Sequence, residues 1–269
     1  MELTVSCLTQ ADRKILDYIR SNPEGFLFSS IGQLARQLGV CEATVSRFVR
    51  HVGCKDFKEL KQLVLRQSAG EGPAAKMART LSDAGEFTLA GWMAQQQQYL
   101  EKTLTGLDEA AFSAAVQEIV SARRVFIHAK SASAALGQLL FFRLRRLGID
   151  TILLPSGGSE VAEGLAQAGR GDLVILFSFS KVSQEGRLIL EYRHQAGYRT
   201  LAFTSRRAAP EEDQGEINLY VYRGDPRAYH TMTAPAAVVD ALVVALSQQM
   251  GAESARRLSR LHQLKGLYR

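Results

Sequence analysis

Apolar side chains recur at helical spacing over residues 31–50, IGQLARQLGVCEATVSRFVR. Gly39 interrupts the pattern, and a glycine readily adopts the positive φ with which many helices end. Ala35 is small enough to let two helices cross closely, and Val40 fills the corner between them. The positions on the shared buried side are Leu34, Leu38, Val45 and Phe48. This spacing predicts two short helices that meet at a tight turn, a helix-turn-helix.

Further helical patterns flank this pair. Thr9 and Asp12 are typical of a helix start, and the helix that follows ends before Asn22 and Pro23. Its apolar positions are Ile15, Leu16 and Ile19. Ser29 or Ser30 then caps the first helix of the pair. These residues predict a third supporting helix on the amino-terminal side of the helix-turn-helix.

A basic helical pattern follows the pair. Its apolar positions are Phe57, Leu60, Leu63 and Val64, and its cations are Lys55, Lys58, Lys61 and Arg66. We expect these cations to lie along DNA phosphates if the pair binds DNA. The run SAGEG at 68–72, followed by Pro73, breaks the periodicity and predicts a domain boundary. Residues 89–104 then read as a polar linker helix.

From Leu107 onward, short apolar runs alternate with helical patterns. The predicted strands are 124–128, 151–154, 173–177, 200–203 and 217–222. The predicted helices are 110–121, 133–147, 160–168, 184–196 and 234–250. Apolar strands separated by long helices predict an α/β fold of three layers, with a parallel five-stranded sheet between two layers of helices. Ligands of such sheets bind at the carboxyl ends of the strands.

Charge and cysteine content narrow the class of protein. Residues 1–70 carry ten Lys and Arg against seven Asp and Glu, whereas residues 71–250 are nearly neutral. A basic amino-terminal part suits a chain that binds nucleic acid with one end. Cys7, Cys41 and Cys54 have no metal-ligand or disulfide spacing, so we expect no metal site and no cofactor. No apolar run is long enough to cross a membrane, which predicts a soluble cytoplasmic protein.

The second helix of the pair is the candidate recognition helix. Arg47 and Arg50 point outward, where they can contact guanine edges or phosphates in the major groove. The predicted DNA-binding residues are Glu42, Ala43, Thr44, Ser46, Arg47, Arg50 and Lys55. An ordinary helical hairpin with a solvated basic face remains the alternative. Cys41 caps this helix less well than a serine would.

Two hydroxyl-rich turns follow neighbouring strands. The first spans residues 129–133, and the second spans residues 178–183 and leads into Glu185. Hydroxyl groups beside the free N–H groups of a helix start favour an anion such as phosphate. The predicted ligand-binding residues are Ser131, Ser133, Ser178, Ser180, Lys181, Ser183 and Glu185. Serines that only cap helices are the alternative, and a third polar turn at 156–159 either closes the pocket or caps a helix at Ser159.

These motifs resemble the RpiR family of bacterial transcription regulators, which join a helix-turn-helix to a sugar isomerase (SIS) domain. The resemblance rests on residues 34–53, on KDFKELK at 55–61, on 172–185, on ArgLeuGly at 146–148 and on AspAlaLeu at 240–242. It implies a homodimer or homotetramer that binds palindromic operator DNA, and a SIS domain that binds a phosphorylated sugar. We therefore expect a helix-turn-helix domain over 1–77, a linker helix over 78–107 and a SIS domain over 108–269.

The chain departs from the SIS pattern at three positions. The first SIS loop usually reads Gly-x-Gly-x-Ser, but Ala129 and Ser131 replace the glycines, and only Ser133 matches. In the second loop Lys181 replaces a glycine. A side chain at any of these positions can crowd a backbone that must approach a phosphate closely, although the Lys181 ammonium can also add a cation to the site.

Three functions remain open. The first is a regulator whose operator binding responds to a phosphorylated sugar, and which is not an enzyme. The second is a sugar-phosphate isomerase, for which Glu160, Glu185 or His230 supplies the acid or base. His128 and His194 are expected to be strand-end and surface residues. The third is a constitutive DNA-binding protein whose SIS domain only holds protomers together.

Overall fold

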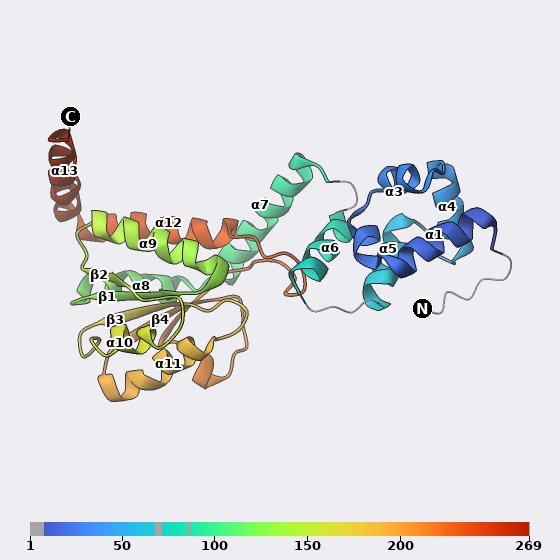
Figure 1. The fold of residues 1–269 in the computed structure, drawn as a ribbon. Coiled ribbons are helices and arrows are strands. Elements are labelled where there is room, and N and C mark those ends of the chain that lie inside the picture. The colour runs from blue at the N-terminus through green and yellow to red at the C-terminus, as the bar shows by residue number, and fades with distance from the viewer. Residues whose placement is uncertain (1–7, 68–71, 85–86, 269) are drawn as a thin grey trace. The chain divides into compact units, whose positions relative to one another are not determined.

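The structure is a computed structural model that describes residues 8–67, 72–84 and 87–268. The chain forms two compact units (Figure 1). The first comprises Met1–Gln95 and Gly224–His230, and the second comprises Gln96–Arg223 and Thr231–Arg269. Cys7 and all but the last residue of the predicted boundary run at 68–72 lie outside the described residues.

The first unit is built from helices. They are α1 (Gln10–Ser21), α2 (Pro23–Phe28), α3 (Ile31–Leu38), α4 (Glu42–His51), α5 (Phe57–Gln67), α6 (Pro73–Ala84) and the first part of α7 (Leu89–Gly106). Thr9 forms a capping box with Asp12, and Ser30 forms one with Gln33, so α1 and α3 begin where the sequence predicts. The short helix α2 was not predicted: its cap, Asn22, accepts a hydrogen bond from the N–H of Gly25.

One apolar core holds these helices together. The residues expected on the buried side, Leu34, Leu38, Val45 and Phe48, are all buried in it. Phe26 of α2 is fully buried and meets Phe57 of α5 edge to face, with 5.5 Å between ring centroids. Helix α6 packs on α2 and α5. The expected boundary between residues 77 and 78 therefore falls inside an element of the first unit.

A late segment of the chain, Gly224–His230, completes the first unit. We call this segment the strap. The backbone N–H of Tyr229 donates a hydrogen bond to Thr80 Oγ1 of α6 over 2.9 Å. The Tyr229 ring also lies 6.2 Å from the Trp92 ring of α7, centroid to centroid. The first unit thus depends on residues more than a hundred positions away in the sequence.

The second unit contains the predicted sheet. Its strands are β1 (Val125–Ala129), β2 (Thr151–Leu153), β3 (Leu173–Phe177), β4 (Arg199–Thr204) and β5 (Ile217–Tyr220). They pair in the order β2-β1-β3-β4-β5, and every pair is parallel. The α/β fold with a parallel five-stranded sheet is therefore confirmed. The chain passes from β1 outward to β2 and then returns to β3, so the order reverses between β1 and β3, where such sheets bind ligands.

Helices cover both faces of this sheet (Figure 1). One face packs against α8 (Glu109–Ser121), α9 (Ala134–Arg146) and α12 (Thr233–Met250). The other packs against α10 (Glu160–Leu165) and α11 (Gln184–Ala196). Alternate residues of β1 and β3 face the two cores, as Ile127 and Phe126 of β1 do. A further helix, α13 (Ala252–Gly266), is mostly exposed.

Helix α12 serves the core of the second unit. Val239, Leu242 and Leu246 are fully buried against the sheet and the neighbouring helices. By length and composition α12 meets the criteria for a membrane span, which core helices of soluble proteins also meet. Its buried side chains identify it as a core helix.

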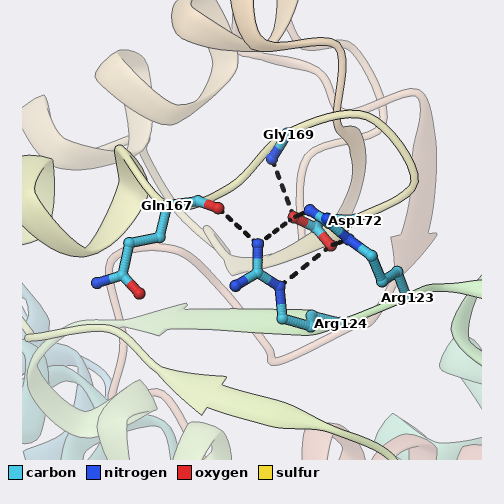
Figure 2. Close-up of polar contacts among 5 residues, drawn as sticks. All are labelled: Arg123, Arg124, Gln167, Gly169 and Asp172. Carbon is cyan, nitrogen blue, oxygen red and sulfur yellow. Dashed lines mark hydrogen bonds and ion pairs between the residues drawn. The ribbon is translucent and has the colours of Figure 1, made fainter.

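A buried carboxylate ties the amino ends of the two central strands together (Figure 2). Asp172 accepts two hydrogen bonds from Arg123, at 2.9 and 2.7 Å, and its side chain is fully buried. Arg124 donates to the same carboxylate at 2.9 Å and to the carbonyl oxygen of Gln167 at 2.6 Å. The N–H of Gly169 completes the set at 2.9 Å. Burial alone raises the pKa of this carboxyl, but these hydrogen bonds outweigh it and hold the pKa well below 3.8.

We predict that Asp172→Asn lowers the free energy of unfolding by about 3 kcal/mol at pH 7, because it removes one partner of a buried ion pair. The carboxyl has a lower pKa in the folded chain than in the unfolded chain. Its contribution is therefore complete above the unfolded value near 3.8 and declines as the pH falls through the lower folded value. Urea unfolding of both chains between pH 2.5 and 7 measures this, and a stability difference that stays constant below pH 4 contradicts the prediction.

Candidate DNA-binding and ligand-binding sites

The helix-turn-helix has the geometry that its sequence predicts. Gly39 has φ of 64° and ends α3 in the left-handed region. The N–H of Val40 then donates to the carbonyl oxygen of Ala35 over 3.0 Å, which closes the turn. Cys41 stands at the cap of α4 and makes no side-chain capping hydrogen bond. The second helix therefore begins with the weak cap that the sequence indicates.

The outward face of α4 presents the predicted residues. Ala43, Arg47 and Arg50 are exposed, and Thr44 and Ser46 are half-buried. Arg47 Nη2 donates to Thr44 Oγ1 over 3.2 Å, so these two side chains form one polar group on this face. Glu42 is exposed but turns back toward α3, because a Cβ added at Gly32 would lie 2.6 Å from its carboxylate. There the carboxylate lies near the positive end of the α3 dipole, a stabilising position that the spacing alone does not indicate.

The basic row beyond α4 is shorter than expected. Lys55 and Lys58 are exposed, but Lys61 is buried. Burial lowers the pKa of the Lys61 ammonium, which lies 5.4 Å from the centroid of the Phe57 ring. The prediction that Lys61 joins a phosphate-facing surface is wrong, because the helix turns this residue toward the core.

The first polar turn follows β1. It contains the short helix η1 (Ser131–Ser133), which leads into α9. Ser131 has φ of 55°, and among the described residues it alone has positive φ without being a glycine. That conformation costs a non-glycine residue about 1 kcal/mol or more. The turn thus keeps the backbone shape for which the SIS pattern has glycine, although serine now occupies the position.

Ala129, the other replaced glycine, is accommodated by the neighbouring helix. It is buried at the end of β1, and Gly137 of α9 faces it. A Cβ added at Gly137 would lie only 2.8 Å from the Ala129 Cβ, closer than such atoms approach in proteins. The absence of a side chain at Gly137 therefore leaves room for the Ala129 methyl group.

The second polar turn follows β3. Ser178 Oγ is buried and has no hydrogen-bond partner among the residues that the structure describes. Ser183 Oγ caps α11 by accepting from the N–H of Gly186 over 3.1 Å, and Ser180 Oγ accepts from Arg223 Nη2 over 2.8 Å. Lys181 is exposed and lacks positive φ, so its replacement of glycine does not strain the turn.

An ion pair joins the two turns. Lys130 Nζ lies 2.7 Å from Glu185 Oε1, and this hydrogen bond lowers the pKa of the Glu185 carboxyl to about 2. The third turn borders the same pair, since a Cβ added at Gly157 would lie 3.1 Å from Glu185 Oε1. All three predicted turns therefore gather at the carboxyl edge of the sheet.

Sequence reasoning missed two residues of this edge. Lys130 lies within a serine-rich turn, and Arg223 follows the last strand in a stretch without a motif. His128 lies near the end of β1, as expected, and it is buried there, with Nδ1 3.2 Å from the Pro155 carbonyl oxygen and Nε2 without a hydrogen-bond partner among the described residues. Burial lowers the pKa of His128 and favours the neutral imidazole.

The isomerase candidates belong to different elements of the chain. Glu160 is exposed in the first turn of α10. Glu185 is held in its ion pair with Lys130. His230 belongs to the first unit, where its Nε2 lies 3.0 Å from the Pro226 carbonyl oxygen. Among the described residues no group of His, Cys, Asp and Glu is placed to hold a metal ion.

Two family models match the chain. The model of the rpiR-family helix-turn-helix domain matches residues 2–71, and the model of the SIS domain matches residues 118–245. The chain belongs to the RpiR family. The candidate recognition helix α4 of this RpiR-family chain lies in the first matched region, and the serine turns lie in the second.

Solved structures share the fold of this RpiR-family chain. The sugar isomerase domain of an RpiR transcription factor from Sphaerobacter thermophilus is 24% identical, with a TM-score of 0.59, over 64% of this chain and 96% of that one. Vibrio vulnificus NanR, complexed with ManNAc-6P, is 21% identical, with a TM-score of 0.58, over 96% and 93%. A putative sugar-phosphate isomerase from Listeria monocytogenes is 18% identical, with a TM-score of 0.54, over 66% and 100%.

We predict that Gly137→Ala destabilises the chain by about 1–2 kcal/mol, because overpacking against Ala129 outweighs the better helix propensity of alanine. In an Ala129→Gly background the same change should be neutral or stabilising. Urea unfolding of the two single variants and the double variant measures this coupling. Gly266→Ala is the matched control, since open space surrounds that helical glycine. Additive effects of the two substitutions would show that the two positions do not compensate.

Proposed function

We propose that this chain is a cytoplasmic transcription regulator that binds operator DNA through α4 and a phosphorylated sugar through the serine turns of its SIS domain. The proposal of DNA binding rests on the exposed arginines of α4 and on the helix-turn-helix that carries them, whose turn and apolar core are complete. The ligand half rests on hydroxyl groups at the carboxyl edge of the sheet. Binding of the sugar phosphate then alters the affinity for the operator.

The buried, unpartnered Ser178 hydroxyl carries the ligand proposal. A buried polar atom without a hydrogen bond is costly, and a bound phosphate oxygen removes that cost. Ser180, Lys181 and the N–H groups that begin α11 add further donors around the same turn. The structure of NanR supports this chemistry, because that protein shares the fold of this chain and was solved in complex with ManNAc-6P.

The charge state of the same residues favours a sensor over an isomerase. Isomerisation of a sugar needs a group that accepts and returns a proton. Glu185, with its pKa near 2, stays ionised and engaged by Lys130 at neutral pH. His128 is neutral, and its Nδ1 is directed at the Pro155 carbonyl oxygen. The carboxyl edge of the second unit thus holds groups suited to binding an anion more than to exchanging a proton.

A second copy of the chain is the proposed occupant of an apolar groove in the second unit. The groove lies between α7, α8 and α12, and its lining includes Leu100, Leu104, Phe112 and Ala241. Leu104 is 77% exposed, which is high for a leucine beside other apolar side chains. A symmetric pair of chains carries two recognition helices, which is why we propose a palindromic operator.

We predict that DNA sequences selected from a random pool by the purified chain contain inverted repeats, and that Arg47→Ala weakens binding to them by about 1–3 kcal/mol. The reason is the loss of a charged contact to a base edge or phosphate. Arg13→Ala, which removes an equal charge from an exposed position on α1, is the control. Gel-shift titration compares the three chains. Equal affinity for the Arg47→Ala variant and the parent chain would remove α4 from the interface.

A panel of sugar phosphates tests the ligand. We expect one of them to raise the stability of the folded chain by about 2.7 kcal/mol at a hundred times its dissociation constant, measured by thermal unfolding, while its neutral parent sugar does nothing. Ser180→Ala and Lys181→Gly should each weaken the binding of that sugar phosphate.

The sugar phosphate that stabilises the chain should also change the affinity of the chain for its operator in the gel shift. NMR of that sugar phosphate after incubation with the chain detects isomerisation, and turnover would support the isomerase. If no sugar phosphate of the panel raises the unfolding temperature, the chain is better described as a constitutive DNA-binding protein.

A further inference from the structure

Arg223 is a buried cation at the carboxyl edge of the sheet. It lies three residues beyond the end of β5, and it is 6% exposed. Among the described residues no carboxylate forms an ion pair with it, and burial lowers its pKa to about 10. A desolvated guanidinium is costly unless an opposite charge accompanies it.

Other arginines of this unit show what a partnered guanidinium looks like here. Arg124 is paired with Asp172 at 2.9 Å, and Arg206 is paired with Asp213 at 2.7 Å. Arg223 is more buried than either, yet its hydrogen bonds lead to hydroxyl groups. The counter-ion of Arg223 is therefore missing from the described part of the protein itself.

The contacts of Arg223 orient two hydroxyl groups as donors. Its Nη2 donates to Ser180 Oγ over 2.8 Å, and its Nε donates to Ser205 Oγ over 3.1 Å. A guanidinium cannot accept a hydrogen bond, so both serine oxygens must act as acceptors toward it. Each hydroxyl proton is then left to point at another acceptor. The guanidinium lies 4.2 Å from the centroid of the Phe179 ring, and this contact fixes its plane.

We propose that Arg223 is the counter-charge of the effector's phosphate monoester, and that it holds the Ser180 hydroxyl as a donor to the same phosphate. This inference rests on the proposed function, because it assigns a new residue to the proposed effector site. A planar fork of N–H groups suits a phosphate better than a neutral sugar hydroxyl. Arg223 thus favours ligands that carry a doubly charged phosphate ester. The serine turn supplies hydrogen-bond donors that surround the same phosphate.

Inorganic phosphate is the probe, because it presents the charged group alone. Thermal unfolding is followed against phosphate concentration at pH 7.5, with chloride replacing phosphate at constant ionic strength. We expect Arg223→Gln to bind phosphate about 10- to 100-fold more weakly than the parent chain, the usual effect of losing a charged hydrogen-bond donor. Arg207→Gln is the matched control, because Arg207 is exposed and rests over the Tyr220 ring. It should bind phosphate as the parent chain does.

Two further variants separate a direct role from a structural one. Arg223→Lys keeps the charge but loses the fork, so its affinity should fall between those of the parent chain and Arg223→Gln. Combining Arg223→Gln with Ser180→Ala should cost less than the sum of the two single changes, because one residue acts partly through the other. If Arg223→Gln does not fold, Arg223→Lys and its combination with Ser180→Ala make the same comparison.

The outcomes are distinct. Phosphate binding by the parent chain with undiminished binding by Arg223→Gln overturns this inference and leaves the effector site in place. Tighter binding by Arg223→Gln also overturns it, since the guanidinium would then be occupying the place of the phosphate. No binding of phosphate or any sugar phosphate by the parent chain removes this inference and the proposed sugar-phosphate sensor together.

Discussion

The buried carboxylate of Asp172 is the constraint on which the second unit depends. It binds Arg123 and Arg124, just before β1, while lying just before β3, so it places the amino ends of the two central strands beside each other. Val125 then pairs with Leu173, and the register continues to Ala129 and Phe177. Because both strands have the same length from that anchor, their serine turns emerge side by side at the opposite edge. An ionic group at one edge of the sheet thereby positions the serine turns of the candidate ligand site at the other.

The prediction from sequence succeeded where periodicity and caps agree. The bounds of β3 and α11 match the structure, since an unbroken apolar run and a helix between Ser183 and Gly197 leave little freedom. It failed where tertiary packing decides. Asn22 and Pro23 predict the end of a helix, which is where α1 ends. Burial of Phe26 in the core then stabilises the next residues as a further helix, α2. Lys61 looked like a surface cation until the packing of the first unit enclosed it.

The serines of the candidate site could be predicted from the sequence, but its charged residues could not. Ser178, Ser180 and Ser183 follow a recognisable strand end, whereas Arg223 lies forty residues further along and reaches Ser180 only because β5 closes the sheet. The replaced glycines make a related point. Ser131 keeps the left-handed backbone, and Gly137 makes room for Ala129. The turn is thus maintained as a shape, and the residues that produce this shape differ from those of the family pattern.

The strap has a consequence for dissecting this protein. The chain passes between its two units at residues 95, 223 and 230, so neither unit is a continuous stretch of sequence. A fragment that stops anywhere in α7 lacks Tyr229, and with it the hydrogen bond to Thr80 and the ring beside Trp92. Conversely, the isolated carboxyl-terminal fragment carries seven strap residues that have lost the surface they pack on. Either half expressed alone therefore lacks contacts that the whole chain has, and limited proteolysis of the whole chain compares the stabilities of its two parts with these contacts in place.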